Sequence, residues 1–372
     1  MEKDMGRTKE SRVGGPGWSR REVLKAAAVG AGLGVAPAFV RHAGASTPRK
    51  VKFQLAWIPS GQHAYVFLAK KFWAEKGLEV QVDRGFGSGE TAKGVGLEKY
   101  DFGEASYSVM VNSIGQGLDL MAIGARVQRT AFAVFSLKGS GITRPKDLEG
   151  KTVIATTGSG EYVLFPAFAK LAGIDASKVK FLLVAPPVRH PMLLERKADA
   201  MTGYLVSDGA VLLGQGAELE ILPYADYGFR LLDLGLLTQS KRVREDPKLC
   251  ADFVEGAMKG LRLQLVEPRA AADVTLQTLK EYQGAPAAPS IIEHGLEISN
   301  ALSAVPAVEK GGLGAMDPED WATTVDMVTK YMGLPKAVDP ASVYTNTFAG
   351  TEKLTPQEWA AVKARVRKFI RV

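Results

Sequence analysis

The chain has 372 residues, of which 46% are hydrophobic and 23% charged. It is therefore longer than one ordinary domain and has the composition of a globular protein. It contains no run of about 18 apolar residues, which excludes an integral membrane protein. Residues 1–45 carry +4 of the formal net charge of +7, and the basic residues of the remainder are dispersed among acidic ones, which excludes the basic block of a nucleic-acid-binding protein.

The first 45 residues (1–45) have the pattern of an export signal. Arg20-Arg21 is followed by an uncharged, mostly apolar stretch, 26–40, and then by a small-residue cleavage site, A-G-A. Paired arginines before an Ala/Gly-rich segment resemble a twin-arginine signal. We expect a periplasmic protein that is cut near Ala45.

The next segment predicts a βαβ unit. Apolar and polar residues alternate over 51–57, and a helical stripe of apolar residues then runs to Lys76-Gly77. Alternation resumes over 78–83. Strand, helix and strand within about 30 residues are typical of α/β proteins.

The alternation of short strands and helices continues along the chain. Further strands are predicted at Tyr100–Phe102, Leu120–Ile123, Ala131–Leu137, Thr152–Ala155, Val179–Val184, Ala198–Gly203 and Leu219–Leu222. Helices are predicted at Glu161–Leu171, Pro191–Lys197, Ser207–Gln215, Asp246–Val266, Arg269–Tyr282, Ser290–Leu302, Pro318–Tyr331 and Thr355–Ile370. This pattern predicts open, mostly parallel sheets with flanking helices and a helical C-terminal extension.

Several short motifs, in this order and spacing, resemble one family of proteins. They are W-I-P-S-G-Q-H-A-Y at 57–65, K-G-L-E-V at 76–80, D-F-G at 101–103, D-L-E-G-K at 147–151 and A-D-A at 198–200. The family is that of the periplasmic solute-binding proteins of ABC importers that take up thiamine-pyrimidine precursors, with sulfonate, taurine and nitrate binders as relatives. The resemblance covers roughly residues 50–237.

The resemblance implies a two-lobed α/β clamp, the type II periplasmic-binding-protein fold. Lobe one would hold 50–136 plus 235–372, and lobe two 137–234, with crossings near 136–141 and 233–238. Ligands of open α/β sheets bind at the carboxyl ends of the strands, so the cleft between the lobes is the expected site. The implied partners are a small molecule and a membrane permease, the mature protein being a monomer without a cofactor.

Four candidate ligand-binding residues follow the first strand. Trp57 lies at the carboxyl end of that strand, where its ring can stack on a ligand, and Ser60, His63 and Tyr65 lead into the next helix. In related pyrimidine binders the position of Ser60 is usually asparagine. The alternative for Trp57 is that it only covers the core.

Glycine- and serine-rich loops provide further candidates. Gly158, Ser159 and Gly160 precede Glu161 and present backbone N–H groups at the expected start of a helix. The loop 87–89 has the same character. Glycine and serine are also ordinary turn residues, which is the alternative for both loops.

Two pairs of side chains complete the candidate site. Ser106 and Tyr107 follow the third expected strand. Tyr204 and Asp208 lie one helical turn apart at the end of a strand in lobe two, which brings an aromatic ring and a carboxylate to one place.

The motifs of common enzymes are absent from the sequence. The single cysteine, Cys250, excludes a disulfide within the chain and a cysteine cluster for a metal. One branch of the resembled family makes the thiamine pyrimidine itself from a lysine-bound cofactor and a histidine, but the matching stretch here, 102–109, has neither residue type. We therefore expect a binding protein with no metal, and a pyrimidine-synthase-like enzyme is the alternative.

The sequence favours a small heteroaromatic ligand over an anion. The carboxylates of Glu161 and Asp208 suit the hydrogen bonds of an amino group, and candidate aromatic side chains suit stacking on a ring. An aliphatic sulfonate, taurine or nitrate would instead need a desolvated arginine. Arg189 and His190 would meet that need, but we expect them to lie on a solvated loop.

The export signal can be tested by replacing Arg20 and Arg21 together with lysine. We expect the precursor to stay in the cytoplasm, because the twin-arginine route depends on that pair. Fractionation and immunoblotting will locate the chain. Normal export of the double variant, or of the wild type in cells without the translocase, would contradict the assignment.

Overall fold

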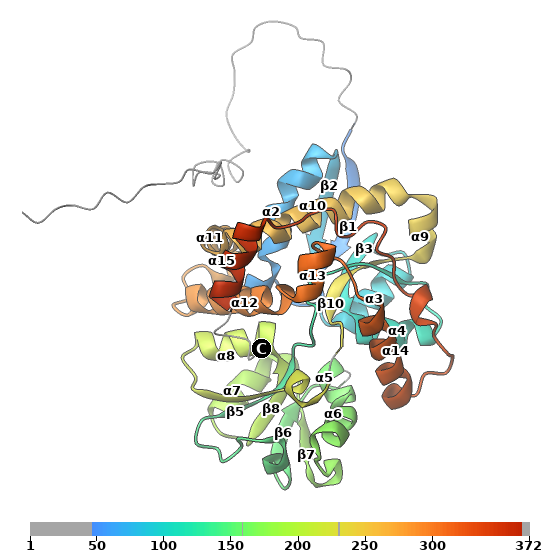
Figure 1. The fold of residues 1–372 in the computed structure, drawn as a ribbon. Helices are drawn as coiled ribbons and strands as arrows, with labels where there is room; N and C mark the ends of the chain where they lie inside the picture. The colour runs from blue at the N-terminus through green and yellow to red at the C-terminus, as the bar shows by residue number, and fades with distance from the viewer. Residues whose placement is uncertain (1–46, 158, 230, 367–372) are drawn as a thin grey trace, which may run out of the picture. The chain divides into compact units, whose positions relative to one another are not determined.

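The computed structural model of the protein describes residues 47–157, 159–229 and 231–366, which belong to one compact unit, Gly44–Val372. Two five-stranded sheets with flanking helices form this unit (Figure 1). The expected export signal lies outside the described residues. No helix among the described residues is long and apolar enough to cross a membrane.

The first sheet combines four parallel strands with one antiparallel strand. Its order is β2-β1-β3-β10-β4, and β10 runs antiparallel to both β3 and β4. The strands are β1 (Arg49–Gln54), β2 (Leu78–Asp83), β3 (Phe102–Ser106), β4 (Met121–Ala125) and β10 (Leu234–Thr238).

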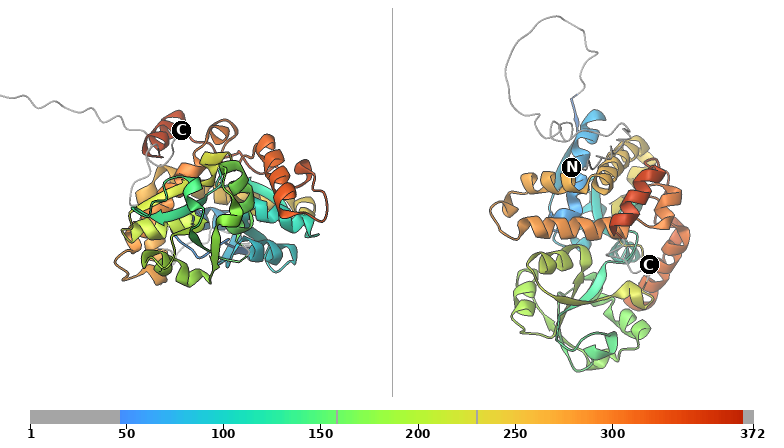
Figure 2. Two further views of the ribbon diagram at one scale, coloured as in Figure 1. Left: turned by 90° about the horizontal axis from the view of Figure 1, so that it is seen from below. Right: turned by 60° about the vertical axis from the view of Figure 1, so that its left-hand side comes forward.

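The second sheet repeats this arrangement. Its order is β7-β6-β8-β5-β9, and β5 runs antiparallel to β8 and β9. The strands are β5 (Phe132–Leu137), β6 (Thr152–Ala155), β7 (Lys180–Leu183), β8 (Ala200–Tyr204) and β9 (Leu219–Pro223). Figures 1 and 2 show these green strands grouped apart from those of the first sheet.

Helices connect the strands and make up most of the C-terminal part. The longer helices are α2 (Ala64–Glu75), α3 (Ser88–Gly96), α4 (Tyr107–Gly115), α6 (Phe165–Ala172), α10 (Pro247–Val266), α11 (Pro268–Thr278), α12 (Ala288–Ser303), α14 (Pro318–Met332) and α15 (Pro356–Val366). The shorter ones include η1 (Gly61–His63), α5 (Gly160–Val163), α7 (Arg189–Leu194), α8 (Ala210–Gly214), α9 (Ser240–Glu245) and α13 (Pro306–Gly311).

A stack of aromatic rings fixes α2 and α10 to the first sheet. Phe253 of α10 stacks on Phe102 of β3 with ring centroids 3.9 Å apart, and Trp73 of α2 stacks on Phe253 at 5.2 Å. Trp73 Nε1 also donates to the Phe253 carbonyl oxygen at 2.8 Å. The rings are fully buried, so both helices are held against the strands whose ends form the site.

The second sheet has its own aromatic core, which extends to the start of α5. Phe168 of α6 stacks on Tyr224 with ring centroids 3.9 Å apart, and Phe132 of β5 meets Tyr224 edge-on. The Tyr224 hydroxyl donates to the Glu161 carbonyl oxygen at 3.0 Å. The backbone at Glu161 is therefore anchored to the loop that follows β9.

The predicted fold class is confirmed, and the differences concern individual elements. The strand expected at Thr152–Ala155 coincides with β6, and the C-terminal helices lie close to where the sequence places them. The third strand was predicted at Tyr100–Phe102, whereas β3 begins at Phe102 and continues to Ser106. The prediction ended too early because the buried Glu104 interrupts the apolar pattern of this strand. A helix start was expected at the loop 87–89, where α3 begins, but β10 and α4 were not predicted.

The chain enters the second sheet earlier than the expected boundary at 136/137, because β5 already pairs with β8 and β9. Asp233 links the two segments that pass between the sheets. Its Oδ2 accepts from the Ala131 backbone N–H at 2.6 Å, and its own N–H donates to the Val127 carbonyl oxygen at 3.2 Å. The side chain is 1% exposed. The crossings therefore share one buried carboxyl group.

Burial raises the pKa of Asp233 to about 7, although the Ala131 N–H, Ser106 and Arg126 favour its charged form. The unfolded value is about 3.9. The folded state therefore binds a proton at Asp233 more tightly than the unfolded state does. The stabilisation that comes from this protonation is fully present below about pH 4 and is lost as the pH rises to about 7.

We predict that Asp233→Asn raises the melting temperature relative to the wild type more at pH 8 than at pH 5. The amide oxygen still accepts from Ala131, while the buried charge is removed. Differential scanning calorimetry at both pH values measures the difference, with the exposed Asp226→Asn as control. An equal difference at both pH values would contradict the raised pKa.

Candidate functional site

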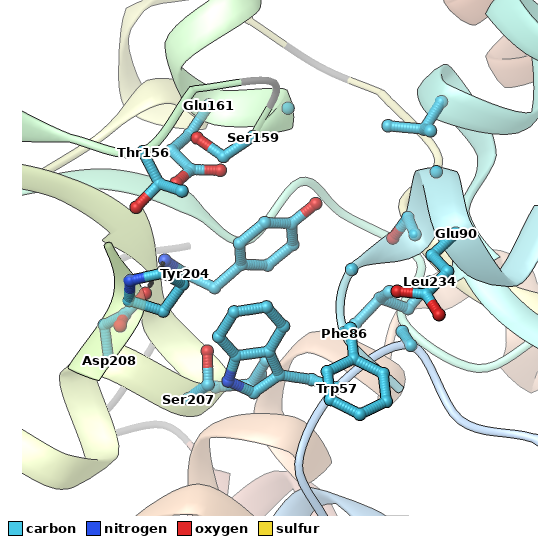
Figure 3. A pocket seen from close by; sticks show the side chains of 18 of the residues that line it. Trp57, Phe86, Glu90, Thr156, Ser159, Glu161, Tyr204, Ser207, Asp208 and Leu234 are labelled. Atoms are coloured by element: carbon cyan, nitrogen blue, oxygen red, sulfur yellow. Dashed lines mark hydrogen bonds between the residues drawn. The ribbon is translucent and has the colours of Figure 1, made fainter. Parts of the chain in front are cut away.

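A cavity of about 210 Å³ lies between the carboxyl ends of the strands of the two sheets (Figure 3). Loops after β1 and β2 form its first wall, and loops after β6, β7 and β8 form its second wall. The lining residues are Ala56, Trp57, Gln62, Phe86, Gly87, Ser88, Gly89, Glu90, Val109, Thr156, Thr157, Ser159, Gly160, Glu161, Pro186, Arg189, Tyr204, Val206, Ser207, Asp208 and Leu234.

The loop after β2 packs directly against the end of β1. A Cβ on Gly85 would lie 2.0 Å from the Leu55 carbonyl oxygen, so no side chain fits there. Gly87 has φ +131°, and its N–H donates to the Ala56 carbonyl oxygen at 3.0 Å. Glycine is suited to both positions. This close approach brings the loop beside Trp57.

Three aromatic side chains point toward the cavity from both walls. Figure 3 shows the ring of Tyr204 facing the same space as the ring of Trp57, with Phe86 next to Trp57. Phe86 is 60% exposed, and the Arg84 guanidinium lies 4.6 Å from its ring centroid. The arrangement presents flat apolar faces on opposite sides of one space.

The second wall is shaped by a distorted helix start after β8. Leu205–Gly209 forms a single turn of π-helix before α8, a distortion that is often found at functional sites. The Tyr204 backbone N–H donates to Asp208 Oδ2 at 2.8 Å. This bond folds the turn back on itself and directs the Asp208 carboxylate toward α7.

An ion cluster occupies the base of the second wall. Arg189 Nη2 donates to Asp208 Oδ1 at 2.6 Å, and Arg189 Nη1 lies 3.5 Å from Glu161 Oε1. His190 Nε2 lies 2.7 Å from Asp208 Oδ1. The expectation that Arg189 lies on a solvated loop is wrong: its side chain is buried between two carboxylates.

The two carboxylates of the cluster differ in their protonation. Burial raises the pKa of Glu161, with Arg189 acting against this shift and Asp208 adding to it. Burial also disfavours the charge of Asp208, but Arg189 and His190 outweigh it and hold the Asp208 pKa below its usual value. Asp208 is thus the ionised partner of Arg189, and Glu161 gains a proton more readily.

Three polar atoms of the second wall have no hydrogen-bond partner of ordinary geometry among the described residues. They are Ser159 Oγ, Glu161 Oε2 and Arg189 Nε, all buried. Buried polar groups are normally paired. These three atoms, on residues that line the cavity, are therefore candidates to bind a polar edge of a ligand.

The predicted site residues divide into two groups. Trp57, Ser159, Gly160, Glu161, Tyr204 and Asp208 line the cavity. Gly158 lies outside the described residues. The remaining five are buried in the first half of the structure and are not part of the cavity lining: Ser60, His63, Tyr65, Ser106 and Tyr107.

Tyr65 and His63 belong to a buried polar network centred on Glu104 and Arg126. Arg126 Nη2 donates to Glu104 Oε1 at 2.5 Å, and the Tyr65 hydroxyl donates to Glu104 Oε2 at 2.6 Å. Burial lowers the pKa of His63 to about 4, with Arg126 adding to and Glu104 opposing the shift. His63 is therefore neutral, and Nδ1 accepts from the Ser60 N–H at 3.2 Å.

Ser106 and Tyr107 support the sheet from within. The Tyr107 hydroxyl donates to the Gly124 carbonyl oxygen at 2.8 Å, and a Cβ on Gly235 would lie 1.9 Å from that hydroxyl. The Ser106 N–H donates to Ser88 Oγ at 2.9 Å. Through this bond Ser106 fixes Ser88, which does line the cavity.

Sequence reasoning missed the lining residues Gln62 and Phe86, and it placed Arg189 on a solvated loop. Phe86 had a visible signal, since it is an aromatic residue between two glycines just after a strand. The burial of Gln62 and Arg189 had none, because it depends on partners distant in the sequence, Arg126 and Asp208.

Comparisons with known proteins agree with this architecture. The family model described as "NMT1/THI5 like" matches residues 60–271, more than half of the chain. The riboflavin-binding protein RibY of Chloroflexus aurantiacus is 26% identical over 315 residues, 81% of this chain and 86% of that protein. A 4-amino-5-hydroxymethyl-2-methylpyrimidine phosphate synthase of Legionella pneumophila is 26% identical over 137 residues, 36% of this chain and 43% of that protein.

A solved structure supports the fold. The periplasmic aliphatic sulphonate binding protein SsuA of Escherichia coli superposes with a TM-score of 0.62 at 14% identity, over 80% of this chain and 97% of that one. At this identity the likeness concerns the fold alone. The chain therefore belongs to the NMT1/THI5-like family and has the two-lobed fold of the periplasmic binding proteins.

Proposed function

We propose that this protein is the exported solute-binding component of an ABC importer and that it captures a planar nitrogen heteroaromatic compound between its two sheets. The observation that carries the proposal is the pair of aromatic side chains, Trp57 and Tyr204, which face one cavity from opposite walls beside a buried ion cluster (Figure 3). Such a cavity suits a flat ring with polar edges.

Stacking is the main attraction that the two walls offer. Trp57 comes from the end of β1 and Tyr204 from the end of β8, so a ring held between them contacts both halves of the protein. Each aromatic contact adds about 0.5–1.5 kcal/mol beyond the burial of apolar surface. A ligand that needs both rings would favour the closed arrangement of the two sheets.

The polar end of the cavity favours an amino-bearing or neutral ligand. Arg189 is paired with Asp208 and lies near Glu161, so its positive charge is largely compensated and an anion gains little there. Asp208 Oδ2 accepts from the Tyr204 N–H and has a second lone pair for a ligand donor, and hydrogen bonds to charged groups contribute about 1.5–3 kcal/mol. These features support a heterocycle with an exocyclic amino group or a ring N–H.

The relatives support the same class of ligand. One is named for riboflavin and one for a pyrimidine of the thiamine type, and both compounds are flat nitrogen heterocycles. We keep the thiamine-type pyrimidine as the first candidate and add the flavin ring as the second. Their shared chemistry is what the cavity would recognise.

A small anion such as an aliphatic sulfonate, taurine or nitrate is the second candidate function. The observation in its favour is Arg189, a buried arginine that lines the cavity. The argument against anion binding is that Arg189 already lies between two carboxyl groups. An anionic ligand beside Arg189 would be repelled by the ionised Asp208.

The remaining parts of the proposal concern export, partner and chemistry. The twin-arginine-like signal supports a periplasmic location and cleavage near Ala45. We propose that the mature protein acts as a monomer and delivers its ligand to a membrane permease. We propose that the ligand is released unchanged. A synthase-like reaction is the alternative of another class, and a chemically altered compound after incubation would support it.

We predict that Trp57→Ala weakens the binding of riboflavin or 4-amino-5-hydroxymethyl-2-methylpyrimidine by about 1–3 kcal/mol, through lost stacking and burial. Isothermal titration calorimetry measures the affinity without relying on tryptophan fluorescence. Trp57→Phe, which keeps a flat ring, serves as the matched control and is expected to lose less. Unchanged affinity of Trp57→Ala for a compound that the wild type binds would contradict the stacking role.

We also predict that Asp208→Asn weakens the aminopyrimidine about tenfold or more but affects an analogue without the amino group less, because the amide has no negative charge. The amide oxygen still accepts from the Tyr204 N–H. Asp226→Asn, an exposed change of the same kind, is the control. Tight binding of methanesulfonate by the wild type, with no response to either heterocycle, would replace this proposal by the anion-binding one.

A further inference from the structure

Gln62 lines the cavity although its backbone lies deep in the structure. It belongs to η1 and is 2% exposed. A Cβ on the preceding Gly61 would lie 2.0 Å from the Ile292 carbonyl oxygen, which shows how closely η1 packs on α12. The backbone beneath Gln62 therefore has little room to move.

The orientation of the Gln62 amide is fixed by chemistry. Arg126 Nη2 donates to Gln62 Oε1 at 3.1 Å. A guanidinium carries only donors, so the atom that faces it is the oxygen of the amide and not the nitrogen. The amide nitrogen is consequently on the opposite side, away from Arg126.

Arg126 cannot follow the amide if it turns. Its Nη1 donates to Ser299 Oγ of α12 at 2.8 Å, and its Nη2 to Glu104 Oε1 at 2.5 Å. Both Arg126 and Glu104 are buried, so a rotation of the Arg126 guanidinium would leave the buried charge of Glu104 unpaired. The buried ion pair thus holds the acceptor side of Gln62 in place.

The amide nitrogen is left with donors to satisfy. Among the described residues, the hydrogen bond of the Gln62 side chain is the one that it accepts from Arg126, and Nε2 donates to none of them. Because Gln62 lines the cavity, a bound molecule is the partner that can accept from it. A ligand that covers this donor without offering an acceptor leaves it unpaired, which is costly, so such ligands are disfavoured.

We infer that Gln62 is a specificity-determining residue, which donates through Nε2 to an acceptor atom of the bound heterocycle, and that Arg126 and Glu104 are positioning residues for it. This inference rests on the proposed function and narrows it. The ligand must carry an acceptor, such as a ring nitrogen or carbonyl oxygen, toward the first wall and a donor toward Asp208 on the second. Both probe heterocycles combine acceptors with donors in this way.

The test replaces Gln62 with glutamate and, separately, with methionine. Gln62→Glu keeps an oxygen for Arg126 but presents an acceptor in place of the donor, and Gln62→Met removes both. Calorimetric titrations at pH 8 use riboflavin and 4-amino-5-hydroxymethyl-2-methylpyrimidine. We expect both variants to bind the probe that the wild type binds at least about tenfold more weakly. Gln116→Glu, the same change at an exposed position, is expected to match the wild type.

A carbocyclic analogue of the pyrimidine, with C–H in place of the ring nitrogens, separates recognition from folding. If Gln62 reads a ring acceptor, Gln62→Met lowers the affinity for the pyrimidine by a much larger factor than the affinity for the analogue. A purely structural role would lower both equally, and that result would overturn the inference.

The outcomes distinguish this inference from the function on which it rests. Wild-type binding of a probe, with the same dissociation constant in both Gln62 variants, would overturn the role of Gln62 and leave the binding function intact. Failure of the wild type to bind either heterocycle would overturn the proposed function and this inference with it. Thermal unfolding of each variant identifies a loss that comes from misfolding, and in that case the other Gln62 variant decides.

Discussion

The buried ion pair between Glu104 and Arg126 is the constraint on which the first wall of the cavity depends. A charge pair taken out of water gains little net stability unless its remaining donors and acceptors are satisfied. Here Tyr65, Ser299 and Gln62 supply most of those partners, and Arg126 Nε alone of the guanidinium nitrogens has none among the described residues. The pair therefore ties β3, the end of β4, α2, α12 and η1 together at one point, directly behind the cavity.

The second wall uses an arginine in a different way. Arg189 is also buried against carboxylates, but its partners Glu161 and Asp208 belong to helical turns that line the cavity, α5 and Leu205–Gly209. In the first half the charges are enclosed and act through a neutral amide, whereas in the second half they border the cavity itself. One protein thus presents a neutral donor on one side of the cavity and ionic acceptors on the other.

The sequence allowed the fold to be predicted because its signal is local and repeated. Alternating strands and capped helices can be recognised one element at a time, and they lie near their predicted places. The exceptions depend on residues that are distant in the sequence. Glu104 can be buried within β3, where it interrupts the apolar pattern, because its charge is paired with that of Arg126. Trp57 and Tyr204 were identifiable from their positions at strand ends, but nothing near Gln62 or Arg189 in the sequence indicates that each would be buried beside the cavity.

Phe86 gives the free protein an exposed ring at the mouth of the cavity, between glycines that leave the loop close to β1. Water that surrounds such apolar surface raises the heat capacity of the system, and covering it with a flat ligand releases that water. The association of this protein with a heterocycle would therefore carry a negative change in heat capacity. The enthalpy of binding would become more favourable on warming and the entropy of binding less favourable, so the relative size of the two would depend on the growth temperature of the cell.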